Sequence, residues 1–301
     1  MRLLLPLLLL APLAATAQEE TRLKVLSFNI WYGGDQVSFA KVIEAIRLSD
    51  ADIVGLQEPD GRTAEIAAAA GYPYVDTRRH ILSRYPIFDS GAGETQSTEA
   101  PPYSTAGLDP DALHALVQVA PHRVVAVANT HLTSDPYGPE LLHDGATPEE
   151  VLANEADTRL PEAEALIAGL APVIATGIPV IVTGDFNSPS HLDETGDGAI
   201  PWPVSKAMEA AGFTDAFRAA NPDPVAQPGL TWTPGRPYPY LPEGETLDRI
   251  DFVWIANATA TAALVMGEAG NPQNGLSVTP WPSDHRAVLA DLTLTPAPAP
   301  A

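Results

Sequence analysis

Residues 23–58, LKVLSFNIWYGGDQVSFAKVIEAIRLSDADIVGLQE, combine three patterns in succession. Residues 23–30 are a largely apolar run that predicts a buried strand. Residues 39–48 carry apolar side chains at helical spacing, and residues 52–57 return to strand character. Together they predict a strand-helix-strand unit near the start of the folded chain.

The same alternation continues along the rest of the chain. Further helices are predicted over residues 63–70, 148–170 and 204–211, and further strands over residues 81–87, 112–119, 123–129, 179–183, 250–255 and 288–294. The short connection at Pro121-His122 predicts a hairpin between two of these strands. Several strand pairs are too close in sequence to hold a crossover helix, so we expect a mixed sheet and an α/β sandwich.

We expect residues 18–294 to form a single domain, because neither an internal repeat nor a linker interrupts them. Apolar residues make up 45% of the chain, which is enough for a sizeable core. Gly and Pro gather in long connections, and long ordered loops in a compact domain are usually functional. We therefore expect a cleft walled by residues 89–110, 134–148, 188–203, 221–246 and 267–283.

The first 17 residues have the features of a secretory signal peptide, in which Arg2 precedes a mainly apolar run that closes on Ala15-Thr16-Ala17. The run is shorter than the roughly 20 residues that cross a bilayer as a helix. We expect cleavage before Gln18, a secreted or periplasmic protein, and no transmembrane segment. The chain has no cysteine, so we expect neither disulfides nor a lipid-modified cysteine. The proline-rich tail at residues 295–301 is predicted to be disordered.

Acidic residues dominate the charge of the chain. Asp and Glu number 38 against 16 Lys and Arg, which gives a formal net charge of −22. Nucleic-acid binding normally needs a basic surface, so this charge disfavours DNA or RNA as partners. It does not exclude them, because a divalent ion in a site reverses the local field. We expect acids of the long loops to lie at the rim of the cleft and to repel the flanking phosphates of a duplex; they include Glu94, Glu99, Asp193, Glu194 and Asp197.

Polar side chains end otherwise apolar strands at five places in the sequence. They are Asn29 in SFNIW, Glu58 in GLQEP, His131 in NTHL, Asp185 and Asn187 in TGDFN, and Asp284 and His285 in SDH. Asp or Asn after a strand commonly makes a turn or a helix cap, so each alone has a structural explanation. Five together predict a shared site, because carboxylate and amide oxygens at neighbouring strand ends suit a hard cation such as Mg²⁺.

Seven motifs occur in a fixed order between Leu23 and Leu292, namely VLSFNIW, IVGLQE, ILSRYPI, VANTHL, VTGDFNS, DRIDFVW and SDHRAV. Together they resemble the endonuclease/exonuclease/phosphatase superfamily, which includes pancreatic deoxyribonuclease, abasic-site endonucleases, neutral sphingomyelinases and inositol polyphosphate phosphatases. One short motif is weak, whereas the ordered set is specific. The resemblance implies a four-layer α/β/β/α sandwich of two packed, mixed and largely antiparallel sheets flanked by helices. It also implies a metal-dependent hydrolase of phosphate esters.

The resemblance implies a metal site and a water-activating group. Glu58 resembles the principal metal ligand, with Asn29 and Asp284 supporting the ion directly or through water. We expect Mg²⁺ there, or Mn²⁺ or Ca²⁺. Asp185 resembles the residue that positions or deprotonates the attacking water, and Asn187 one that donates to a phosphoryl oxygen. The structural alternative for both is that they cap a turn.

The resemblance also implies two catalytic histidines. His285 resembles the imidazole aligned with the scissile phosphate, and Asp251 the carboxylate that orients it, since an acidic partner fixes the tautomer and raises the basicity of the ring. The segment DRIDFVW also offers Asp248, and on a strand these two acids point to opposite faces; we select Asp251. His131 resembles a second phosphate-contacting histidine, or else it satisfies a backbone carbonyl. Whether Asp185 or His285 takes the proton of the water stays open.

The substrate is not fixed by these motifs, because related enzymes act on very different esters. Aromatic residues in the long loops, Trp232, Tyr238, Tyr240 and Trp281, are placed either to stack on a substrate or to pack the loops. The densest basic cluster is Arg78-Arg79-His80 with Arg84, which suits one phosphate rather than a duplex. We expect a monomer acting on a small phosphodiester, phosphomonoester or phospholipid head group. A secreted nuclease and a catalytically silent binding module are the alternatives.

Overall fold

The computed structural model describes residues 21–88, 113–121, 123–193, 195, 199–234 and 246–294. The expected signal peptide, the expected tail, the loop at residues 89–110, Tyr238 and Tyr240 lie outside the described residues. Across the described ranges, no helix is both long and apolar enough to cross a membrane.

Seven strands form the first sheet in the order β12-β11-β13-β1-β2-β4-β3. Their bounds are β1 (Thr21–Asn29), β2 (Ile53–Gln57), β3 (Tyr74–Asp76), β4 (Ile81–Ser83), β11 (Ala258–Glu268), β12 (Asn274–Val278) and β13 (Ala287–Leu294). Strands β1 and β2 run parallel, so α1 (Phe39–Ser49) between them completes the predicted strand-helix-strand unit.

Six strands form the second sheet in the order β5-β6-β7-β8-β10-β9. Their bounds are β5 (Ile87–Phe88), β6 (His114–Ala120), β7 (Arg123–His131), β8 (Val180–Asp185), β9 (Thr214–Asp215) and β10 (Asp251–Ala256). Strands β6 and β7 form the predicted antiparallel hairpin, and β7 pairs parallel with β8. Both sheets are thus mixed and largely antiparallel, as predicted.

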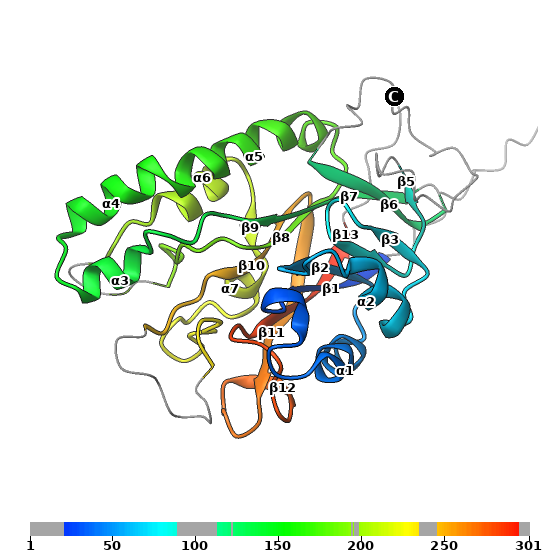
Figure 1. The fold of residues 1–301 in the computed structure, drawn as a ribbon. Helices are drawn as coiled ribbons and strands as arrows, with labels where there is room; N and C mark the ends of the chain where they lie inside the picture. Colours follow the sequence, from blue (N-terminus) through cyan, green and yellow to red (C-terminus); the bar gives the residue numbers. More distant parts are fainter. Residues whose placement is uncertain are drawn as a thin grey trace, which may run out of the picture.

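The two sheets pack face to face with helices outside them (Figure 1). One apolar cluster, which includes Val25, Val127 and Val253, fills the space between the sheets. A second joins α1 and α2 (Thr63–Ala70) to the first sheet, and a third joins α5 (Arg159–Ile174) and α6 (Pro203–Ala210) to the second. This arrangement confirms the four-layer sandwich. The remaining helices are short: η1 (Tyr32–Gly34), α3 (Gly138–His143), α4 (Pro148–Asp157) and α7 (Ala216–Ala220).

One parallel pair in each sheet, β1 with β2 and β7 with β8, places polar residues at the same edge of the sandwich. Asn29 ends β1 and Glu58 follows β2, while His131 and Asp185 end β7 and β8. The carboxyl ends of parallel strands meet at one edge, which brings these side chains together. Between the sheets, a Cβ on Gly55 would lie 1.9 Å from Oγ1 of Thr183, so only glycine permits this close approach of β2 and β8.

Two predicted elements are divided in the structure. The strand expected over residues 81–87 is two strands in different sheets, β4 and β5, because the chain crosses between the sheets at Arg84-Tyr85-Pro86. The helix expected over residues 148–170 breaks at Thr158, which has φ −115° and ψ −87°. Pro161 favours the break, because proline fits the first turn of a helix better than its interior, and it lies in the first turn of α5, which begins at Arg159.

Four strands were not predicted: the short β3 and β9, and the longer β11 and β12. Strand β11 reads ATATAALVMGE and its first half is partly exposed, so its sequence lacks a clear apolar run. Strand β12 lies at the edge of the first sheet, within the segment 267–283 that was expected to be a loop. Part of that expected cleft wall is therefore sheet.

Candidate active site

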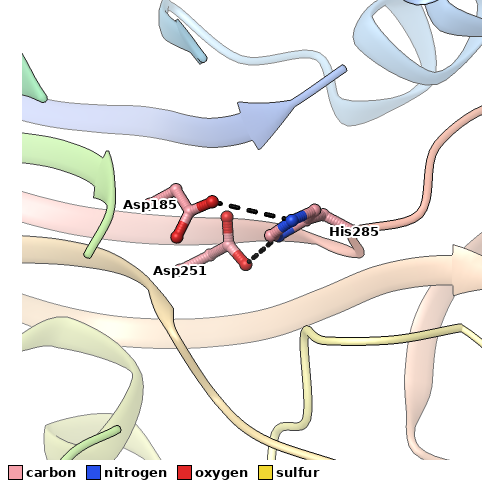
Figure 2. A group of neighbouring side chains, drawn as sticks. All are labelled: Asp185, Asp251 and His285. Atoms are coloured by element: carbon pink, nitrogen blue, oxygen red, sulfur yellow. Dashed lines mark hydrogen bonds and ion pairs between the residues drawn. The ribbon is translucent and has the colours of Figure 1, made fainter. Parts of the chain in front are cut away.

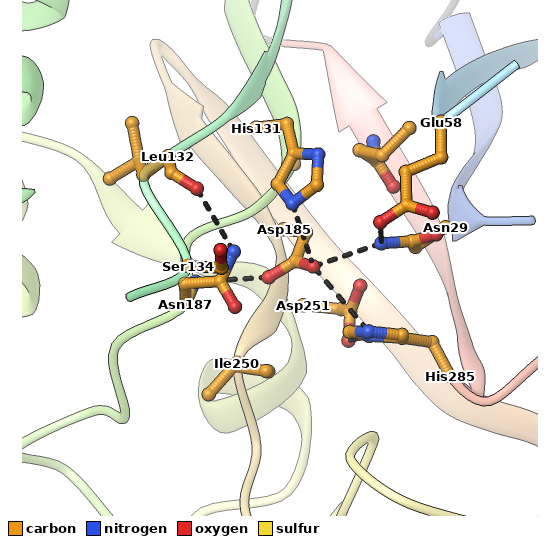
Figure 3. Close-up of polar contacts among 12 residues, drawn as sticks. Asn29, Glu58, His131, Leu132, Ser134, Asp185, Asn187, Ile250, Asp251 and His285 are labelled. Atoms are coloured by element: carbon orange, nitrogen blue, oxygen red, sulfur yellow. Dashed lines mark hydrogen bonds and ion pairs between the residues drawn. The ribbon is translucent and has the colours of Figure 1, made fainter. Parts of the chain in front are cut away.

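A cleft of about 420 Å³ opens where the carboxyl ends of the parallel strands meet. Six of the eight residues selected from the sequence line it: Glu58, His131, Asp185, Asn187, Asp284 and His285. The other two, Asn29 and Asp251, are completely buried and bond to residues that line the cleft. The structure thus gathers all eight at one place, although they span residues 29–285. Figure 3 labels all of them except Asp284.

Asn29 joins the two carboxylates at the base of the cleft. Its Nδ2 donates to Oε1 of Glu58 at 3.2 Å and to Oδ2 of Asp185 at 3.0 Å. Its Oδ1 accepts from the backbone N–H of Trp31 at 3.0 Å. Asn29 therefore links Glu58, which follows β2 of the first sheet, to Asp185, which ends β8 of the second sheet.

The backbone around Glu58 adopts unusual conformations. Glu58 has φ 56°, and Trp31 and Tyr32 have φ 56° and 42°, in the left-handed region that non-glycine residues rarely occupy. The N–H of Tyr32 donates to Oε2 of Glu58 at 2.9 Å. Residues held in such conformations cluster at functional sites. The strained backbone and this hydrogen bond fix the Glu58 carboxylate in the cleft.

His285 and Asp251 form a buried pair at the floor of the cleft (Figure 2). Nδ1 of His285 lies 2.9 Å from Oδ2 of Asp251, and Nε2 of His285 lies 3.6 Å from Oδ2 of Asp185. The second oxygen of Asp251, Oδ1, is buried and has no hydrogen-bond partner. The N–H of Asp251 donates to Oγ1 of Thr231 at 3.1 Å. The pair therefore orients the Nε2 side of the ring toward Asp185.

The charges around His285 favour its protonated form. Burial alone lowers the pKa of His285, but the carboxylates of Asp251 and Asp185 outweigh burial and raise that pKa to about 10. Burial raises the pKa of Asp251, and the charge of Asp185 adds to this increase. A divalent cation beside Asp185 would oppose the proton on His285.

Asp248, the second acid of the DRIDFVW segment, has a different environment from Asp251. It precedes β10, and its backbone pairs with that of Trp232. Its Oδ2 accepts from the hydroxyl of Tyr137 at 3.0 Å and from the hydroxyl of Thr246. The indole ring of Trp232 lies against His285, with ring centroids 4.8 Å apart. Asp248 thus holds the loop that covers His285, whereas Asp251 contacts the imidazole itself.

His131 and Asn187 flank Asp185 from two sides. Nε2 of His131 lies 3.4 Å from Oδ2 of Asp185, and the histidine is exposed in the cleft. The N–H of Asn187 donates to Oδ1 of Asp185, and its Nδ2 donates to the carbonyl of Leu132. Asn187 therefore makes the turn contact that was the structural alternative to a catalytic role. Its amide still has a second N–H for a ligand.

A buried ion pair supports the loops after His131 and Asn187. Arg159 and Glu155 are fully buried, and Nε of Arg159 donates to Oε1 of Glu155 at 2.9 Å. The guanidinium also donates to three carbonyls in the loop after His131, those of Thr133, Ser134 and Pro136. Oε2 of Glu155 accepts from the hydroxyl of Ser188, the residue after Asn187. One ion pair thus holds both loops.

Comparison with known proteins identifies the family of the chain. A model of the endonuclease/exonuclease/phosphatase family matches residues 26–285. The chain belongs to this family. An uncharacterized protein of Caenorhabditis elegans is 28% identical over 304 residues, which cover 90% of this chain and 91% of the relative.

Solved structures of the family share the fold. An endonuclease/exonuclease/phosphatase from Beutenbergia cavernae has a TM-score of 0.51 and 20% identity, and the match covers 93% of this chain and 73% of that one. The catalytic domain of human Nocturnin, solved with a bound sulfate, has a TM-score of 0.53 and 16% identity, with 91% and 95% covered. At these identities the structures show a common architecture alone.

As a member of the endonuclease/exonuclease/phosphatase family, the protein is a divalent-metal-dependent hydrolase of phosphate esters. The residues present fit a hard cation, because the cleft presents carboxylates from Glu58, Asp185 and Asp284 and no described sulfur ligand. Asp185, Asp251 and His285 also place one donor atom each within 4.8 Å of one another. These three residues share Asp185 with the carboxylates of the cleft. Asp251 is already hydrogen-bonded to His285.

Trp232, which was named from the sequence as a residue that stacks on a substrate or packs its loop, lines the cleft. Other cleft residues were not selected from the sequence. Tyr137 is one of them, although both aromatic residues come from loops that were expected to wall the cleft. Their positions in long loops were the available signal. Trp281, by contrast, packs against Phe28 and donates its Nε1–H to the carbonyl of His285, so its role is structural. The acids Asp60, Asp135 and Glu140 also line the cleft, and nothing in the motifs indicated them.

Replacing Asp251 by Asn should lower kcat roughly 10²–10⁴-fold, because the neutral amide removes the charge that orients and stabilises the imidazole of His285. The measurement is steady-state hydrolysis of bis(p-nitrophenyl) phosphate with Mg²⁺, with thermal melting to confirm folding. Asp157→Asn, an exposed change at the end of α4, is the matched control and should retain activity. A folded Asp251→Asn variant with wild-type kcat would contradict a catalytic role for the pair of His285 and Asp251.

Proposed function

We propose that the protein hydrolyses small phosphate esters, either phosphodiesters, phosphomonoesters or phospholipid head groups, in preference to duplex nucleic acid, and that Mg²⁺ is its metal. The observation that carries this proposal is the charge of the cleft. Its lining includes six carboxylates, and across the described residues it includes neither Lys nor Arg. A duplex lays many flanking phosphates on the surface around a site, and each contact normally needs a basic side chain.

The acids at the cleft differ from those expected from the sequence. Asp193 was expected at the rim, but it accepts from Arg218 and Arg249 in a largely buried cluster. Glu94, Glu99, Glu194 and Asp197 lie outside the described residues. The repulsion of a duplex therefore rests on Asp60, Asp135 and Glu140, which are exposed in the cleft.

The geometry supports in-line attack of water on phosphorus. Asp185 accepts hydrogen bonds through both of its oxygens and lies between His131 and His285, which places it to orient a water. The two imidazoles and the second N–H of Asn187 provide donors for phosphoryl oxygens. A divalent cation would be held by Glu58 with Asn29 and Asp284, and it would supply positive charge for the same oxygens. Asp185 and His285 both remain candidates for the base.

A substrate panel tests the proposal. Specific activity is measured at equal phosphate concentration, low salt and saturating Mg²⁺ on bis(p-nitrophenyl) phosphate, p-nitrophenyl phosphate, sphingomyelin and plasmid DNA. We expect at least one small ester or the lipid to be hydrolysed faster than the plasmid, and chelation to abolish this activity. Glu58→Gln protein prepared in parallel controls for contaminating nuclease. Faster turnover of the plasmid would favour the nuclease alternative, and no turnover would favour the binding module.

A further inference from the structure

A second cleft of about 420 Å³ adjoins the catalytic one. Both clefts are lined by Glu58, Asp60 and His131, so they meet at the carboxylate assigned to the metal and at one of the two imidazoles assigned to the phosphate. The second cleft differs in charge, because Arg78 and Arg79 line it. A phosphate ester seated over Glu58 and His131 therefore has a cleft without arginine on one side and a cleft lined by arginines on the other, with Asp60 where the two clefts meet.

The turn that carries these arginines is fixed by its own side chains. Oδ1 of Asp76 accepts from the N–H groups of Arg78 and Arg79 at 3.0 and 3.1 Å. Oδ2 of Asp76 accepts from Nη1 of Arg79 at 2.7 Å, and both groups are buried. Arg79 is therefore a structural cation that braces the turn.

The turn is also bonded to the strands that hold the catalytic residues. Nδ2 of Asn129, on β7, donates to the carbonyl of Arg79 at 3.0 Å and to that of Leu56 at 2.8 Å. The N–H of Leu56, on β2, donates to the carbonyl of His80 at 3.0 Å. Since β2 leads to Glu58 and β7 ends at His131, the position of Arg78 is tied to theirs.

Arg78 differs from Arg79 because its side chain is exposed at the second cleft. Arg84, the other arginine of the basic cluster, pairs with Asp50 and does not line either cleft. A guanidinium matches the geometry of a phosphate better than an ammonium does, through paired N–H donors. Among the described residues, the exposed positive charge that lines the second cleft therefore comes from Arg78.

We propose that the second cleft binds an additional anionic group of the substrate, a phosphate monoester carried by the same molecule as the scissile ester, through Arg78. This inference rests on the proposed function and names its substrate class: small esters with a second phosphate. It remains compatible with poor use of a duplex, because it supplies a site for one further phosphate on one side only.

The test uses two chromogenic substrates that differ by one phosphate, the 4-nitrophenyl ester of thymidine 5′-phosphate and the same compound with a 3′-phosphate. Both release 4-nitrophenol from the same scissile group. The wild type should show about a tenfold higher kcat/KM for the bisphosphate, mainly through KM, as expected for hydrogen bonds to a charged group. Arg78→Gln should remove this preference and leave the activity on the monophosphate ester unchanged.

Arg22→Gln is the matched control, because Arg22 is exposed at the opposite end of β1 from Asn29 and its loss changes the net charge equally. This variant should keep the preference. An unchanged preference in Arg78→Gln, or no preference in the wild type, would overturn the second site while the hydrolase assignment stands. If neither ester were hydrolysed, the proposed function would fail. Calorimetric binding of thymidine 3′,5′-bisphosphate with Mg²⁺ would then decide the second site, because equal affinity in wild type and Arg78→Gln would refute it.

Discussion

Replacing Glu58 by Gln is expected to reduce kcat/KM about a thousandfold, since a bound metal contributes several kcal/mol to stabilising the transition state. Gln has the same shape but no charge. Its amide would also place an N–H₂ group near one of two donors that now bond to the carboxylate, Nδ2 of Asn29 or the N–H of Tyr32. The substitution therefore weakens the attraction for a cation and disturbs the hydrogen bonds that hold the ligand.

The measurement combines hydrolysis of bis(p-nitrophenyl) phosphate across a Mg²⁺ titration with calorimetric binding of the metal. Glu164→Gln is the control, because Glu164 is an exposed residue of α5 and the change in charge is identical. Wild-type activity should persist in the control and disappear on chelation. An equal loss of activity in both variants would contradict the assignment of Glu58 as a metal ligand. Full activity after exhaustive chelation would show that the reaction needs no metal.

Replacing Arg159 by Met is expected to lower the free energy of unfolding by about 3–5 kcal/mol, which is typical when one member of a buried ion pair is removed. The loss arises because Glu155 stays buried without a counter-charge and because three carbonyls after His131 lose their donor. Urea denaturation followed by tryptophan fluorescence measures it. Activity should fall as well, since the freed loop begins one residue after the catalytic histidine.

Two further variants separate charge burial from other effects. The double variant Glu155→Leu with Arg159→Met should lose less stability than Arg159→Met alone, because no charge is then left buried. Arg22→Met, an exposed change, should alter the free energy of unfolding by less than about 0.5 kcal/mol. If the single and double variants were equally unstable, packing rather than the unpaired carboxylate would be the cause. Arg159→Lys serves as the milder change if the Met variant fails to fold.

Elements with strong apolar periodicity were predicted well. The first strand was expected over residues 23–30 and is Thr21–Asn29, and the second helix has the predicted bounds of Thr63–Ala70. Elements whose sequence carries weak patterns were missed, such as β11, where Ala and Thr alternate at a partly exposed sheet end. Local sequence also did not show that Ile81 and Ile87 belong to different sheets, since this depends on how the sheets pack.

The sequence by itself determined which chemical groups end the strands. Asn29, Glu58, His131 and Asp185 follow apolar runs, and the direction of each strand sends them to one edge once β1 pairs with β2 and β7 with β8. Those parallel pairs follow from the helices that connect the strands, which the sequence also shows. The family motifs and the acidic composition are likewise properties of the chain alone.

Only the tertiary structure decided which of these groups meet. Antiparallel pairing of β10 with β8 sets Asp251 opposite Asp185 and within reach of His285, while Asp248 bonds to Tyr137 in a loop far away in sequence. The same packing places Trp232 over His285 and Trp281 in the core. These contacts join residues that are distant along the chain, so they depend on sheet register and loop closure rather than on any local pattern.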